Sequence, residues 1–156
     1  MHKLWHGKKR DMRIENNWIK IGSLVAALAV VLGAFDFQEI ANQYSGRGPT
    51  QAASDFAIDT ERAILFQFVH ALAIVLVGVL MVLRPGRLLK MSAQSFLLGT
   101  IMFSGSIYAA SLTGIAWIQH FKLVGVVLLV AGWILLVEGG CPGWNAKTEE
   151  QAEGVS

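Results

Sequence analysis

The chain has 156 residues, of which 54% are hydrophobic and only 15% are charged, whereas charged residues make up about 25% of a typical soluble domain. This composition excludes an ordinary soluble domain and predicts an all-α integral membrane protein. A net charge of +2 gives no support for nucleic-acid binding, and the single cysteine, Cys141, excludes an internal disulfide or a cysteine-based metal cluster within one chain.

Four apolar runs predict a membrane four-helix bundle, with helices at residues 18–37, 62–83, 93–114 and 117–137. A basic segment, residues 1–17, precedes the bundle, and a polar tail, residues 138–156, follows it. The sequence Arg84-Pro85-Gly86-Arg87 ends the second helix clearly, because proline and glycine both interrupt helices.

The basic residues predict how the helices are oriented. With four spans, both termini and the connector between the second and third helices share one side of the membrane. That side carries ten lysines and arginines and the other side only three. By the positive-inside rule, both termini are expected in the cytoplasm, and the chain in a bacterial inner membrane.

Small residues recur at helical spacings and predict where helices pack closely. The run from Phe96 to Gly114 also carries hydroxyl groups, which a purely lipid-facing span does not need. We expect it to be the central packing helix. The residues expected at helix–helix contacts are Gly22, Ala26, Ala29, Gly33, Gly99, Gly105, Gly125 and Gly132.

Several polar residues are predicted to lie at one depth, in the outer half of the bundle. His70 lies eight residues inside the second helix, or roughly 12 Å at the helical rise, and Ser106 lies eight residues from the far end of the third. The predicted layer, read as a binding site or as interhelical hydrogen bonds, consists of Gln67, His70, Ser104, Ser106 and Tyr108.

His70 is the one ionisable residue in the central part of a predicted span, and three roles are open to it. It can fix helix register through hydrogen bonds, contact a ligand or substrate, or ligate a metal or haem. A second buried histidine for haem is missing from the predicted layer, and we expect no cofactor and no metal. We predict a hydrogen bond from His70 to Ser106 or Tyr108.

Two stretches resemble signatures of a small membrane family. Phe66–Ala73 resembles its tyrosine-glutamine-x-x-histidine-alanine-leucine-alanine motif, and Phe103–Tyr108, continuing to Leu112-Thr113-Gly114, resembles its second motif. Gly33-Ala34-Phe35 and Gly132-Trp133 match shorter pieces. On these residues the chain is similar to the family called domain of unknown function 423, which is itself similar to eukaryotic transmembrane protein 256. The resemblance implies a four-helix inner-membrane protein and no established activity.

The chain departs from that family at two places. Asp36-Phe37-Gln38 stands where the family has glycine, alanine and histidine, and Lys122–Val126 replaces a threonine-proline-x-glycine-glycine motif.

No phosphate-binding loop, nucleophile elbow or metalloprotease motif is present in the sequence. We therefore expect a non-enzymatic accessory or scaffold subunit, in contact with the lipid bilayer and with protein partners or further copies of itself. The alternatives are an oligomeric small-molecule transporter or channel, and a haem or quinone-site redox protein.

Overall fold

The computed structural model describes residues 2–35, 51–113 and 115–140, and this part of the chain is built from helices. Their bounds are α1 His2–Gly33, α3 Gln51–Leu83, α4 Arg87–Thr113, the 3-10 helix η1 Ala116–His120 and α5 Phe121–Gly140. The prediction of an all-α membrane four-helix bundle is confirmed. The orientation of the termini stays a prediction.

Three of these helices are long and apolar enough to cross a membrane: Ala57–Leu83, Arg87–Thr113 and Trp117–Gly140. The apolar part of the fourth, Asn17–Gly33, is shorter. Its 17 residues measure about 25 Å as a helix, slightly less than the roughly 30 Å of a hydrocarbon core.

The helices extend beyond the predicted spans. α1 begins at His2 and so continues through the segment expected to precede the bundle, and α3 begins at Gln51 rather than at residue 62. The apolar run marks only the part of a helix that lies in hydrocarbon, and polar residues can extend a helix past it. At the far end, η1 carries residues 116–120 before α5 begins at Phe121. Residues 36–37 and 141–156 lie outside the described part.

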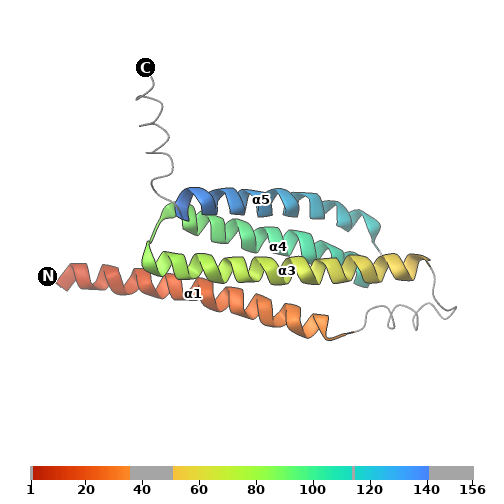
Figure 1. Cartoon of the computed structure of the whole chain (residues 1–156), viewed down its shortest axis with the longest axis horizontal. Helices are drawn as coiled ribbons and strands as arrows, with labels where there is room; N and C mark the ends of the chain where they lie inside the picture. Colours follow the sequence, from red (N-terminus) through yellow and green to blue (C-terminus); the bar gives the residue numbers. More distant parts are fainter. Residues whose placement is uncertain (1, 36–50, 114, 141–156) are drawn as a thin grey trace, which may run out of the picture.

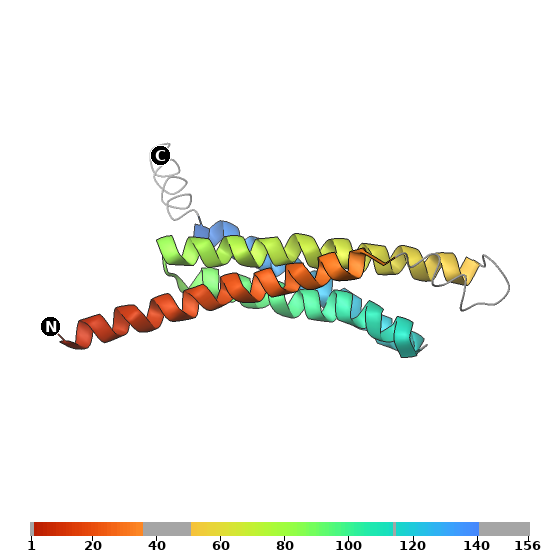
Figure 2. The ribbon, with the colours of Figure 1, turned by 90° about the horizontal axis from the view of Figure 1, so that it is seen from below.

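The four helices form an open row in the order α1, α3, α4, α5 (Figure 1). Extensive contacts join α1 to α3, α3 to α4 and α4 to α5, whereas α3 and α5 touch at few points. Seen from below, α1 crosses the row at a shallow angle, and its N-terminal part projects past the end of α3 (Figure 2). The row leaves α1 and α5 as edge helices.

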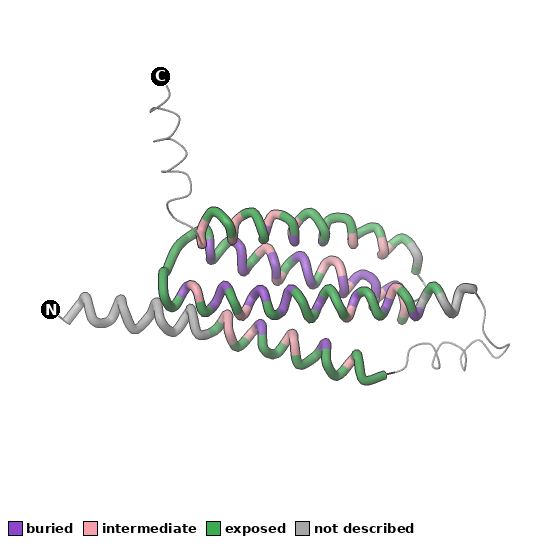
Figure 3. The backbone as a smooth tube through the Cα atoms, viewed as in Figure 1, coloured by how far each residue is buried: buried purple, intermediate pink, exposed green. Residues whose placement is uncertain are grey.

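The best-buried residues belong to the two inner helices, α3 and α4 (Figure 3). Phe96 and Ile74 are completely buried at their interface, together with Val77 and Ala93. The edge helix α5 is less buried than the inner helices: only 22% of its most apolar stretch is buried within the protein, against 44% of the corresponding stretch of α3. Its large aliphatic side chains therefore cover little of the protein and face its surroundings.

Glycines make the contacts between neighbouring helices close. A Cβ on Gly125 would stand 2.5 Å from the backbone nitrogen of Phe103, and one on Gly22 would stand 2.9 Å from the backbone oxygen of Ala71. Gly99 packs against Leu129 and Gly132 against the ring of Phe96 in the same manner. The close packing at the α4–α5 and α1–α3 interfaces thus depends on glycine having no side chain.

The remaining small residues of the predicted set differ in their surroundings. Ala29 is buried and Ala26 is half-buried, while a Cβ on Gly33 would make only an ordinary contact, 3.5 Å from Ile64. Gly105 has no atom within 4 Å of where a Cβ would stand. The sequence pattern could not separate Gly105 from its neighbours, because spacing gives a helix face without saying whether a partner covers it.

Candidate functional site

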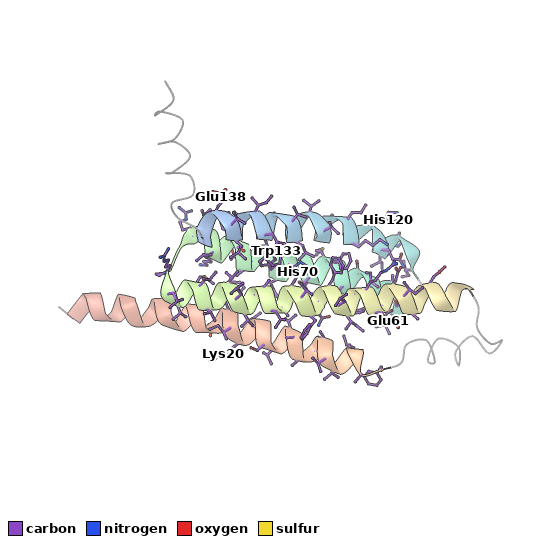
Figure 4. The ribbon with its side chains drawn as sticks, viewed as in Figure 1. Lys20, Glu61, His70, His120, Trp133 and Glu138 are labelled. Atoms are coloured by element: carbon purple, nitrogen blue, oxygen red, sulfur yellow. The ribbon has the colours of Figure 1, made fainter. Side chains whose placement is uncertain are left out.

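His70 lies at the centre of the molecule, where α3, α4 and α5 approach one another (Figure 4). Its Nδ1 atom is 2.8 Å from the backbone oxygen of Phe66, one turn earlier on α3. Its Nε2 atom is 3.3 Å from the indole Nε1 of Trp133 on α5. Both ring nitrogens are therefore engaged within the chain.

The chemistry of these two partners fixes the tautomer of His70. A backbone carbonyl can only accept a hydrogen bond, so Nδ1 must carry the proton that is donated to Phe66. An indole N–H can only donate, so Nε2 must be unprotonated and accept from Trp133. The histidine in this arrangement is neutral, and the Nε2 lone pair that a metal would need is occupied by the indole.

Aromatic rings surround the imidazole on three sides. The ring centroids of Phe66 and Phe96 both lie 5.8 Å from that of His70, and Trp133 lies 6.2 Å away in an edge-on arrangement. Phe96 and Trp133 also pack edge to face at 5.1 Å, and Phe103 stacks on Phe66 at 4.6 Å. These contacts exclude water from the imidazole. In the resulting low-dielectric surroundings the Trp133–His70 hydrogen bond is electrostatically stronger than it would be in water.

Gln67, one turn before His70, connects three helices. Its amide nitrogen donates to the backbone oxygen of Val25 on α1 at 3.0 Å, and its amide oxygen accepts from the hydroxyl of Tyr108 on α4, also at 3.0 Å. The side chain is 3% exposed. Each end of this buried amide thus has a partner from a different helix.

The two predicted serines have different roles. Ser104 donates from α4 to the backbone oxygen of Ala63 on α3 at 2.8 Å, and this bond joins the two inner helices. Ser106 donates to the oxygen of Phe103, three residues earlier on its own helix. Ser106 is buried but provides no bond between helices.

The predicted hydrogen bond from His70 to Ser106 or Tyr108 is therefore wrong. Tyr108 donates to Gln67 instead, Ser106 turns back on its own helix, and the imidazole takes its partner from α5. The depth comparison counted residues from the predicted helix ends, but α3 begins at Gln51, well before the predicted start at residue 62. The register in which Phe96 contacts His70 and Ser104 bonds to Ala63 places Ser106 opposite residues 60–61, about 15 Å along α3 from His70.

Sequence reasoning missed Trp133 as the partner of His70 and Ser92 as a further interhelical hydrogen-bond donor. The predicted layer did not include Trp133, and its indole reaches His70. Ser92 donates from α4 to the backbone oxygen of Gly132 on α5 at 2.8 Å. The Gly132-Trp133 pair was the available signal, since the glycine lets α5 approach Phe96 closely enough for the indole to reach inward.

Thr100 is the one described residue with a buried side-chain oxygen that has no hydrogen-bond partner. Phe96 contacts His70, and Ser104 bonds to Ala63, so the antiparallel register places Thr100 opposite residues 66–67. Its hydroxyl therefore lies at the level of Gln67.

Two grooves lie away from this layer. One, of about 520 Å³, opens between α1 and α3 and is lined by aliphatic and phenyl side chains together with Glu61. The other, of about 260 Å³, lies between the ends of α3 and α5 and contains Arg84. The described residues contain no group of three or more histidine, cysteine, aspartate or glutamate side chains that could hold a metal ion.

Comparison with known proteins places the chain in a family. The family described as protein of unknown function DUF423 matches residues 32–125, which include α3 and α4 entire. No solved structure matches the chain significantly.

Curated relatives carry the name UPF0382 membrane protein. One from Staphylococcus saprophyticus is 30% identical over 78% of this chain and 94% of its own length. One from Haemophilus influenzae is 28% identical over 81% of this chain and 94% of its own length. One from Staphylococcus aureus is 31% identical over 77% of this chain and 91% of its own length. The protein is a membrane protein that belongs to the DUF423 family.

Proposed function

We propose that the protein is a non-enzymatic scaffold subunit of a larger membrane assembly and that α5 is the helix through which it associates. The observation that carries this proposal is the open row of helices, in which α5 packs on α4 alone along most of its length. Because the row does not close, one long apolar helix surface stays uncovered within the chain.

That surface is continuous. Leu123, Val127, Val130 and Ile134 follow one another at spacings of four, three and four residues, so they share one face of the helix. Each is more than half exposed, whereas Leu129 on the opposite face is 4% exposed against Gly99. We call these four residues the α5 outer face. A helix from another subunit can pack along it without disturbing the row.

The polar layer supports a scaffold in a second way. The hydrogen-bonding groups of Gln67, His70 and Ser104 are directed at other groups of the same chain. Interhelical hydrogen bonds in membranes contribute about 0.6 kcal/mol each on average, so their main effect is to fix which residues of neighbouring helices lie opposite one another. A bundle held in one register presents a constant outer surface to a partner.

Site-specific photo-crosslinking tests the proposal in the native membrane. A photoreactive residue at Val127 or at Ile134 is expected to give an adduct with the same protein partner, because both positions lie on the α5 outer face. The matched control is Leu72, an exposed position on α3 (50% exposed) that is expected to give lipid adducts only. Lipid adducts alone from both α5 positions, together with a lone monomer after gentle extraction, would contradict the proposal.

The groove between α1 and α3 favours a second candidate function, a small-molecule transporter assembled from several copies. Glu61 is a carboxylate beside Phe35 and Phe68 in that groove, a combination suited to a lipophilic cation. Uptake of tetraphenylphosphonium into proteoliposomes that is lost in Glu61→Gln would favour this function over the scaffold.

A further inference from the structure

The groove at the opposite end of α3 combines apolar walls with a positive charge. It has a volume of about 260 Å³ and is lined by Leu80, Leu83, Leu89 and Arg84, with the backbone of Gly139 and Gly140 completing it. We call it the Arg84 groove. Gly139 approaches Leu88 and Leu89 so closely that a Cβ would stand 3.0 to 3.3 Å from their atoms, so α5 packs tightly against the start of α4 beside the groove.

The groove lies at the level where the spans end. The apolar span of α3 ends at Leu83, that of α4 begins at Arg87, and the last apolar span ends at Gly140. Leu83, which is 72% exposed, and Leu80 therefore lie on the hydrocarbon side, while Arg84 lies where lipid headgroups begin. This order along the membrane normal is that of a phospholipid, with an acyl chain below and a headgroup above.

The charges around the groove favour an anionic headgroup. Arg84 in the turn between α3 and α4, and Arg87 and Lys90 in the first turn of α4, are all exposed, and among the described residues none of them forms a salt bridge. The nearby carboxylate is Glu138, which Figure 4 places at the same end of α5 and which does not line the groove. The described side chains at this end thus carry three positive charges against one negative charge.

From this combination we infer that the Arg84 groove is a binding site for an anionic phospholipid, with the phosphate beside Arg84 and an acyl chain against Leu80 and Leu83. Basic pockets between transmembrane helices are suited to anionic headgroups, and each lysine or arginine near the surface adds to the attraction. The guanidinium can donate two parallel hydrogen bonds to a phosphate. An acidic peptide would satisfy the charge and leave the exposed leucines uncovered, whereas a phospholipid covers both.

Native mass spectrometry of the full chain tests this site. The protein is released from nanodiscs that contain equal amounts of phosphatidylglycerol and phosphatidylcholine with matched acyl chains, and the retained lipids are counted. We expect wild type to retain phosphatidylglycerol in preference to phosphatidylcholine. In Arg84→Gln that preference should fall about fivefold, and Arg87→Gln should lower it in the same direction.

Arg62→Gln is the matched control. It removes one positive charge from the opposite end of α3, where Arg62 forms only an exposed pair with Asp59 at 3.7 Å, so the lipid preference should equal that of wild type. Equal retention of the two lipids by wild type, or an equal loss in Arg84→Gln and Arg62→Gln, would overturn the inference. Displacement of the lipid by millimolar inorganic phosphate would assign the groove to a free anion, and retention of a second copy in place of the lipid would assign it to self-association.

Discussion

Trp133 and His70 form a side-chain pair between two helices that otherwise barely touch. The indole donates across to α3, and the imidazole accepts only in the tautomer that also donates to Phe66. Phe96 lies against both rings and keeps them facing each other. This small set of residues therefore determines the position of α5 relative to α3.

Replacing Trp133 with phenylalanine removes the indole donor and keeps an aromatic ring in the layer. We expect Trp133→Phe to destabilise the protein by about 1 kcal/mol, within the range measured for interhelical hydrogen bonds. A double-mutant cycle with His70→Phe, followed by unfolding in mixed micelles, isolates the pair from the change in packing. A coupling energy of about 0.6 kcal/mol is expected, and a value of zero would show that the two side chains do not interact.

Two glycines, Gly105 of α4 and Gly125 of α5, should respond very differently to the same substitution. A Cβ on Gly125 would meet the backbone of Phe103 at 2.5 to 2.8 Å, and backbone cannot rotate away as a side chain can. We expect Gly125→Ala to cost about 2 kcal/mol, as overpacking does. Gly105→Ala meets no atom within 4 Å and should change stability by about 0.5 kcal/mol or less. Thermal unfolding in one detergent compares the two, and equal losses would contradict the α4–α5 packing described above.

At the scale of the helices, α1 is attached to the rest of the bundle mainly by packing. Gly22 fits against Val75, and Gly78 of α3 fits against Ile19, so small residues on both helices allow the approach. The hydrogen bond from Gln67 to Val25 adds one polar link. α1 also has the shortest apolar run of the four helices, which makes it the helix most dependent on that link.

Gln67→Met tests this dependence, because methionine has a similar shape and can form neither hydrogen bond. We expect faster amide exchange in residues 17–33 of α1, measured by hydrogen–deuterium exchange in nanodiscs, and a smaller change in α4, which keeps the Ser104 bond to α3. The control is Ser92→Ala, which removes a bond between α4 and α5 and should leave the exchange of α1 unchanged. Unchanged exchange in α1 after Gln67→Met would show that packing alone holds it.

The helices themselves could be predicted from hydropathy, but of their ends only those marked by helix-breaking residues could. The turn at Arg84-Pro85-Gly86-Arg87 was predictable because proline and glycine end a helix whatever surrounds it. The N-terminal starts of α1 and α3 were not, because a polar helix that continues out of the membrane has no apolar signal. In the candidate site, residue depth brought Gln67 and Tyr108 together, but the partner of His70 depends on which way Trp133 turns, and packing decides that.

At the scale of the whole molecule, the position of Cys141 offers a test of orientation without engineering a new label. The chain reaches Cys141 directly after α5, whose end adjoins the basic turn between α3 and α4. If the positive-inside rule holds here, a membrane-impermeant maleimide should label Cys141 only after the cells are permeabilised. In the double variant Arg47→Cys, Cys141→Ser, the maleimide should label the introduced cysteine in intact cells. The opposite labelling pattern would reverse the orientation of the bundle.

The row order also determines how the chain can assemble as it is made. Each helix packs mainly on the one synthesised just before it, so α3 meets α1, α4 meets α3, and α5 meets α4 as each enters the bilayer. Contacts that are local in sequence form quickly because little chain entropy is lost in closing them. Among the described helices, only a few contacts, such as those between α3 and α5, skip a helix in this order. The described interhelical bonds that involve α5, Ser92 to Gly132 and Trp133 to His70, are then the last to form.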